Sequence, residues 1–204
     1  MISLIAFVLL NGTGFSNQYY MYSRRILAGL ISSTIGDIFM VLASFSFTYL
    51  VLAVVFFASA HFLYAVAFGF KPFNLPALAV CVGIYGILMS SLILHFEFHE
   101  SVVGGIYAFI LMLMVWRAVS RLQFFDDLWT WTKLCSCVGA ILFAISDTVI
   151  GYEMFILSEP SAWAHAIVML TYYAGQLGIA LSVVDSQVDE FLHCSIRYKY
   201  TLKE

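Results

Sequence analysis

Residues 47–70 read FTYLVLAVVFFASAHFLYAVAFGF, an unbroken apolar run without aspartate, glutamate, lysine or arginine. An α-helix needs about 20 mostly apolar residues to cross a bilayer, so this stretch predicts a membrane-spanning helix. The whole chain has the same character: 63% of its 204 residues are hydrophobic and 10% are charged. Soluble domains contain about 45–50% apolar and about 25% charged residues. Because a soluble fold of this length could not bury so much apolar surface, we expect lipid to cover it.

Six further apolar runs flank this one, with short connections between them. The seven predicted spans are Met1–Phe15, Ile26–Ala43, Phe47–Phe70, Leu75–Leu94, Val102–Ser120, Trp129–Gly151 and Ala162–Val184. No linker rich in proline, glycine or serine divides the chain. The sequence therefore predicts an all-α integral membrane bundle of seven transmembrane helices. It forms one domain over residues 1–204, with a short tail at about 185–204.

The positions of the basic residues indicate an orientation, because lysine and arginine gather in cytoplasmic loops. With the N-terminus outside, all nine basic residues fall on the inner side: Arg24, Arg25, Lys71, Arg117, Arg121, Lys133, Arg197, Lys199 and Lys203. The outer loops carry Glu97, Glu100, Glu153 and Glu159 instead. The pattern predicts a cytoplasmic C-terminus. No basic cluster is dense enough to suggest a nucleic-acid partner.

Two acidic residues, Asp37 and Asp147, remain inside predicted spans. An ionisable group costs several kcal/mol in a bilayer, so each is a candidate functional residue. Their settings are alike: Gly29, Ser33 and Gly36 share a helical face with Asp37, and Gly139, Phe143 and Ser146 share one with Asp147. At about 1.5 Å per residue the two carboxyl groups lie at similar depth and could face each other. The alternative is that each aspartate merely hydrogen-bonds a neighbouring helix.

Other polar side chains in the spans are candidates for binding or support. They are His61, Tyr64, Trp116, Arg117, Tyr172, Tyr173 and Gln176. His61 and Tyr64 share one face of their helix at positions i and i+3. A buried packing residue is the more ordinary interpretation of His61. An anchor near the membrane surface is the ordinary interpretation of Trp116 and Arg117.

Five of these segments, in this order, resemble the lysoplasmalogenase family, also called the YhhN family. They are GLISSTIGD at 29–37, HFLY at 61–64 with Phe68, WRA at 116–118, GAILFAISD at 139–147 and TYYAGQ at 171–176. Members of this family usually have eight spans, so the resemblance implies that the first of these precedes the start of this chain. It also implies a multi-pass endoplasmic-reticulum protein that needs no metal or organic cofactor.

The resemblance implies hydrolysis of the vinyl ether bond of a lysophospholipid, the lysoplasmalogen, in membrane lipid. The products are a fatty aldehyde and glycerophosphoethanolamine or glycerophosphocholine. Acid cleaves a vinyl ether, so the enzyme needs one carboxylic acid and one carboxylate to activate water. Asp37 and Asp147 suit these roles, because two nearby carboxyl groups in an apolar site hold one proton between them. The sequence leaves open which aspartate is the acid.

Supporting roles follow from position. Tyr172 or Tyr173 is expected to orient a carboxyl group or the water. His61, Gln176 and Arg117 are expected nearer the inner surface than the aspartates, where they would receive the glycerophosphate head group. Ser33, Tyr64, Trp116 and Ser146 complete the expected site.

Other functions compete with this interpretation. The two similar segments ending in aspartate could be an internal repeat around the midplane site of a transporter or channel. A zinc hydrolase commonly needs about three histidines, and only His61 and His165 lie near spans. A retinal protein needs a lysine for its Schiff base, and Ala162–Val184 contains none.

Overall fold

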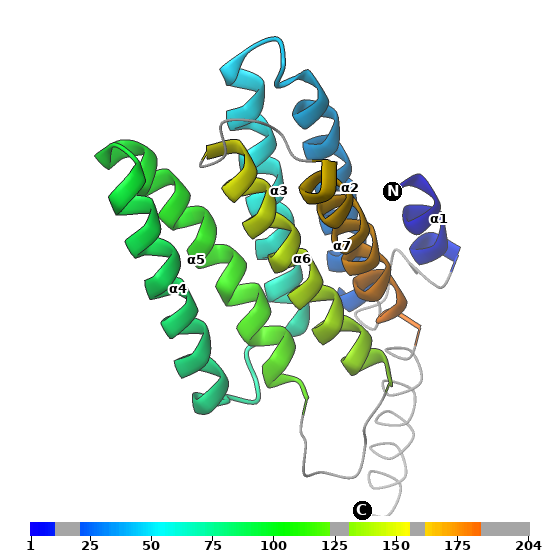
Figure 1. The fold of residues 1–204 in the computed structure, drawn as a ribbon. Helices are drawn as coiled ribbons and strands as arrows, with labels where there is room; N and C mark the ends of the chain where they lie inside the picture. The colour runs from blue at the N-terminus through cyan, green and yellow to red at the C-terminus, as the bar shows by residue number, and fades with distance from the viewer. Residues whose placement is uncertain (11–20, 123–130, 156–161, 185–204) are drawn as a thin grey trace, which may run out of the picture.

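The computed structural model describes residues 1–10, 21–122, 131–155 and 162–184. In these ranges the chain forms α-helices and no strand (Figure 1). The helices are α1 Ile2–Leu10, α2 Met21–Leu42, α3 Phe47–Phe68, α4 Leu75–His95, α5 Phe98–Ser120, α6 Trp131–Phe155 and α7 Ala162–Leu181. The six from α2 to α7 are long and apolar enough to cross a membrane. The protein is an integral membrane helical bundle.

The predicted spans agree with the six long helices, with differences at their ends. Helix α5 begins at Phe98 instead of Val102, so Glu100 lies in its first turn. A negative charge in the first turn interacts favourably with the helix dipole. Apolar composition alone does not include this interaction, so it predicts a later start for the helix. Of the predicted span Met1–Phe15, the structure describes the nine-residue α1. That length reaches about 14 Å, less than a bilayer core of about 30 Å. Residues 11–15 and the predicted tail at 185–204 lie outside the described residues.

Consecutive long helices are antiparallel, so α2, α4 and α6 run one way and α3, α5 and α7 run the other (Figure 1). The closest pairings are α2 with α3 and α6 with α7, and α5 packs against α3, α4 and α6. Helix α4 lies at the edge of the bundle, and Cys81 is its one buried residue. Its apolar side chains, including Val80, Val82 and Ile87, are exposed and suit contact with lipid.

Glycines set the spacing of the two closest helix pairs. A Cβ on Gly139 of α6 would lie 2.7 Å from the carbonyl oxygen of Gly175, and one on Gly175 would lie 2.9 Å from the carbonyl oxygen of Gly139. The backbones of α6 and α7 therefore touch, as small residues permit in membranes. Gly29 of α2 instead faces the ring of Tyr64, which an added Cβ would meet.

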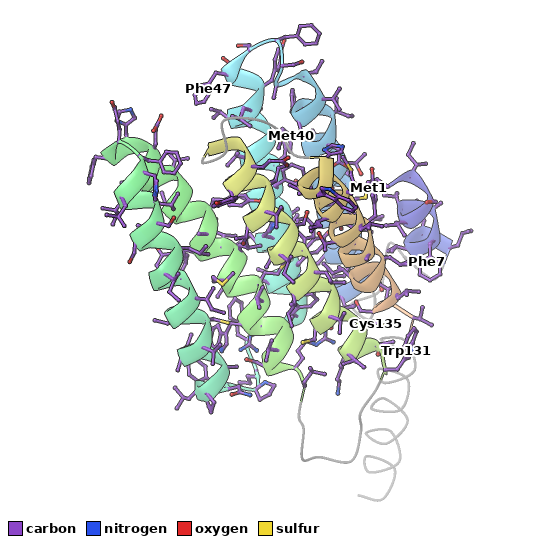
Figure 2. All side chains as sticks on the ribbon, viewed as in Figure 1. Met1, Phe7, Met40, Phe47, Trp131 and Cys135 are labelled. Carbon is purple, nitrogen blue, oxygen red and sulfur yellow. The ribbon has the colours of Figure 1, made fainter. Side chains whose placement is uncertain are left out.

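Charged residues separate to opposite ends of the bundle. Since consecutive helices alternate in direction, α2 and α6 begin at the end where α3 and α5 finish. The described basic residues at this end are Arg24, Arg25, Lys71, Arg117, Arg121 and Lys133. Figure 2 marks the same end with Trp131 and Cys135, and the opposite end with Met40 and Phe47. Glu97, Glu100 and Glu153 lie at the end of Met40 and Phe47, as the sequence predicts.

Candidate active site

The carboxyl group of Asp37, on α2, is held by a tyrosine from α7. The hydroxyl of Tyr172 donates a hydrogen bond of 2.7 Å to Oδ1 of Asp37. The Tyr172 ring is fixed edge-on by Phe143 of α6, with 5.2 Å between centroids, and by Phe57 of α3, at 6.2 Å. Gly36 precedes the aspartate and leaves room for the Phe57 ring. Three helices thus fix the partner of Asp37.

About one helical turn from Asp37, the buried side-chain amide of Gln176 links α2, α3 and α7. Gln176 of α7 accepts a hydrogen bond of 2.9 Å from the Tyr64 hydroxyl and donates one of 3.1 Å to Oγ of Ser33. All three side chains are fully buried. Buried polar groups in lipid need such partners, because no water is available to them. The amide therefore ties α2, α3 and α7 together beside Asp37.

The carboxyl group of Asp147, on α6, has a different set of partners. The hydroxyl of Tyr107 on α5 donates a hydrogen bond of 2.5 Å to Oδ2. Nε2 of His61, on α3, lies 3.0 Å from the same oxygen. The angle of this approach falls short of a hydrogen bond, and Nε2 has no hydrogen-bond partner among the described residues. The other ring nitrogen, Nδ1, lies 2.8 Å from the carbonyl oxygen of Phe57.

Phe143 joins the two aspartate clusters. Its ring packs edge-on against His61, with 4.6 Å between centroids, and against Tyr172, with 5.2 Å. Both Phe143 and His61 are completely buried, whereas the side chain of Asp147 is 11% exposed. The clusters therefore share an apolar wall. Each aspartate takes its partners from helices other than its own.

The remaining predicted site residues make contacts with groups other than the two carboxyl groups. Ser146 donates to the carbonyl oxygen of Val168 and so ties α6 to α7. Tyr173 is half exposed, with its ring against Tyr172. Trp116 donates from its indole nitrogen to the carbonyl oxygen of Asn74. These three contacts position helices and the α3–α4 connection.

Arg117 is buried at the basic end of the bundle. Its Nε donates to the carbonyl oxygen of Gly69 at 2.5 Å, and its Nη1 to that of Pro72 at 3.1 Å. Its guanidinium also lies over the ring of Trp116, 4.8 Å from the centroid. In the described part of the chain, Nη2 has no hydrogen-bond partner. Arg117 thus ties the α3–α4 connection to α5.

The sequence does not predict the contact between His61 and Asp147. It expects His61 nearer the inner surface than the aspartates, beside Gln176 and Arg117. In the structure Nε2 of His61 lies 3.0 Å from Oδ2 of Asp147. Counting residues from each loop cannot detect this, because the register between two helices depends on how their side chains pack.

One residue of the site was missed from the sequence. Tyr107 lies within the predicted span Val102–Ser120, and its hydroxyl contacts Asp147. A tyrosine in the middle of an apolar span needs a partner for its hydroxyl, which is the signal that could have found it.

The gathered groups are two carboxyl groups, three phenols, an imidazole, an amide and a serine hydroxyl. Such groups bind, hold and transfer protons. Within the described ranges, no three histidine, cysteine, aspartate or glutamate residues are grouped to hold a metal ion.

Comparison with known proteins agrees with the sequence motifs. The chain matches the YhhN family over residues 1–183. It is 36% identical to lysoplasmalogenase TMEM86A of Bos taurus over 181 residues, which are 89% of this chain and 73% of that protein. Over the same shares it is 33% identical to lysoplasmalogenase TMEM86A of Homo sapiens. Human lysoplasmalogenase TMEM86B is 33% identical over 82% of this chain and 66% of that protein. No solved structure matches. The chain belongs to the YhhN family.

Proposed function

We propose that this protein hydrolyses the vinyl ether bond of lysoplasmalogens. The relatives that match it are named lysoplasmalogenase, and they align with most of the chain. The observation that carries the proposal is the pair of membrane-embedded aspartates, each bonded to a tyrosine hydroxyl. Charged groups at such depth are retained for function rather than for stability.

The reaction needs an acid first. Protonation of the outer alkene carbon uses the electron pair of the double bond to form a C–H bond and leaves an oxocarbenium ion. Water then adds to that ion, and a carboxylate takes the proton that the water loses. Glycosidases stabilise a similar cation with paired carboxyl groups. Asp37 and Asp147 supply the two groups, one protonated and one ionised.

Collapse of the hemiacetal completes the cycle. The carbon–oxygen bond to glycerol breaks, and the glycerol oxygen receives the proton that the base took from water. The hemiacetal hydroxyl returns its proton to the original acid as the aldehyde carbonyl forms. One water is consumed, both aspartates recover their starting states, and no oxidant, reductant or further reactant is needed.

The substrate is expected to enter with its chain in lipid and its phosphate at the basic end. The described basic residues gather at that end, and one Arg117 nitrogen there has no hydrogen-bond partner among the residues that the structure describes. Positively charged ends face the cytoplasm, so we propose that this end and the C-terminus face it. The endoplasmic-reticulum membrane is the location that the family resemblance implies. We propose Arg117 as a head-group contact, with ethanolamine or choline beyond it.

Aldehyde release from lysoplasmenylethanolamine by the purified protein in lipid nanodiscs tests the function. Asp37→Asn and Asp147→Asn should each lower kcat by at least about 100-fold, as expected for loss of an acid or a base. The matched substrate control is the saturated alkyl ether analogue, which cannot be protonated at an alkene carbon and should not react.

Two results would contradict the proposal. One is a well-folded protein, eluting as a single species, that releases no aldehyde. The other is equal cleavage of an ester lysophospholipid, which would make the protein an esterase. Protein-dependent solute flux into liposomes without lipid turnover would favour a transporter instead.

A further inference from the structure

The tautomer of His61 is determined by its backbone contact. Nδ1 lies 2.8 Å from the carbonyl oxygen of Phe57, within hydrogen-bond reach. A carbonyl oxygen can only accept a hydrogen bond, so Nδ1 must carry a hydrogen. In a neutral imidazole the second nitrogen is then an acceptor, so Nε2 carries a lone pair.

That nitrogen lies beside a carboxyl oxygen. Nε2 of His61 is 3.0 Å from Oδ2 of Asp147, and the His61 side chain is fully buried. An unprotonated nitrogen 3.0 Å from an ionised carboxylate oxygen is repelled by it, and the burial of His61 leaves little solvent to screen the repulsion. An additional proton on either atom removes the repulsion. The pair is then either a protonated His61 beside the Asp147 carboxylate or a neutral His61 beside the Asp147 carboxylic acid. The pair therefore holds one proton more than a neutral imidazole and a carboxylate.

The surroundings of Asp37 differ. Its described hydrogen bond comes from Tyr172, whose hydroxyl donates. Asp147 accepts a similar hydrogen bond from Tyr107, so the tyrosines do not distinguish the two carboxyl groups. Among the described contacts, no imidazole stands beside Asp37. The two aspartates therefore differ in the partner that can store a proton.

We propose that Asp147 is the acid of the reaction, that Asp37 is the base, and that His61 is the positioning residue that shares the proton of Asp147. This inference rests on the proposed function and assigns its roles. In the first step the shared proton leaves Oδ2 of Asp147 and bonds to the outer alkene carbon. The His61–Asp147 pair changes from neutral to anionic as the oxocarbenium ion forms, and the hydrogen bond from Tyr107 stabilises that anion. The proton returns to Asp147 from the hemiacetal hydroxyl when the glycerol oxygen leaves.

His61→Asn is the sharpest test, because an asparagine amide can still donate to the Phe57 carbonyl but has no counterpart of Nε2. We expect kcat to fall at least about 100-fold, while KM for the lysolipid stays within about twofold, since general acid catalysis is lost and binding is kept. The matched control is His95→Asn. Nδ1 of His95 makes the same contact, 2.9 Å to the carbonyl oxygen of Ser91, but on the exposed end of α4. This control should leave both constants unchanged.

Infrared spectroscopy tests the shared proton without any turnover. In the parent and in the Asp37→Asn variant we expect a carboxyl or imidazolium band from the His61–Asp147 pair. This band should shift when the sample is exchanged into D2O. The band should be absent from Asp147→Asn and altered in His61→Asn. Identical spectra for parent and Asp147→Asn would overturn the shared proton, whether or not the protein is a lysoplasmalogenase.

The two failures can be told apart. A parent that hydrolyses the vinyl ether with an unaffected His61→Asn would refute the role of His61 and leave the function standing. A parent with the expected infrared band and no aldehyde release would refute the function and keep the proton on the pair. If exogenous formate restores the kcat lost in Asp37→Asn, this result supports Asp37 as the base. If formate restores kcat in Asp147→Asn and not in Asp37→Asn, the assignment is reversed.

Discussion

The hydroxyl oxygen of Tyr172 lies 2.7 Å from Oδ1 of Asp37, a residue 135 positions away in the chain. This hydrogen bond joins α7, the last described helix, to α2, and it places a donor on a carboxyl group inside the membrane. A hydrogen bond to a charged group contributes about 1.5–3 kcal/mol. The contact is therefore large enough to influence both the reaction and the packing of these helices.

Tyr172→Phe should lower kcat by about 10- to 100-fold, because about 1.4 kcal/mol corresponds to a factor of ten. The ring contacts with Phe143 and Phe57 do not involve the hydroxyl, so the variant should fold. Aldehyde release measured in nanodiscs gives kcat. Tyr152→Phe, which removes a hydroxyl from an exposed tyrosine near the end of α6, is the control and should be unchanged. Equal activity of Tyr172→Phe and parent would show that this hydrogen bond does not serve catalysis.

Gly139→Ala should destabilise the bundle by about 1–3 kcal/mol, the usual effect of overpacking. The added Cβ would lie 2.7 Å from the Gly175 carbonyl oxygen and 2.9 Å from the Ile179 amide nitrogen, both in backbone that cannot rotate away. Thermal unfolding in detergent measures the change in Tm.

The control for that change is Gly83→Ala on α4, where an added Cβ meets nothing within 4 Å. Alanine is the better helix former, so this variant should be as stable as the parent or slightly more so. If the two alanines had the same effect on Tm, the close contact of α6 with α7 would be disproved.

Tyr64 and Gln176 should be energetically coupled. A double-mutant cycle of Tyr64→Phe and Gln176→Leu isolates their 2.9 Å hydrogen bond. Hydrogen bonds between membrane helices average about 0.6 kcal/mol and reach about 1.7 kcal/mol. We expect a coupling energy in this range, because Tyr64→Phe leaves Oε1 of a fully buried amide without a donor. Additive changes in the free energy of unfolding would mean that the two side chains do not interact.

Arg117→Lys should lower Tm and raise KM for the lysolipid. Lysine has no planar fork, so it cannot donate at once to the carbonyl oxygens of Gly69 and Pro72 and keep a further nitrogen for phosphate. The comparison is Lys71→Gln, which removes an exposed charge from the same α3–α4 connection. It should change Tm little. A lower Tm with an unaltered KM would restrict Arg117 to a structural role.

The sequence predicted the site in part. It identified both aspartates, and it named Ser33, Tyr64, Tyr172 and Gln176, which the structure gathers around Asp37. It gave Tyr172 and Tyr173 as equal alternatives. In the structure, Tyr172 bonds the carboxyl group, while Tyr173 is half exposed. Neighbours on a helix point about 100° apart, so sequence spacing alone could not decide which of the two faces the bundle.

The membrane helices follow from the sequence by itself, because a long apolar segment satisfies its backbone within one helix and is stable in lipid without its neighbours. The same reasoning located the intramembrane charges, since each is costly wherever its helix packs. Only the tertiary structure decided the partners of those charges. His61 and Tyr107 reach Asp147 from α3 and α5 because the rotation and register of packed helices bring them there. Those quantities depend on close contacts such as Gly29 with Tyr64 and Gly139 with Gly175, which join residues far apart in the chain.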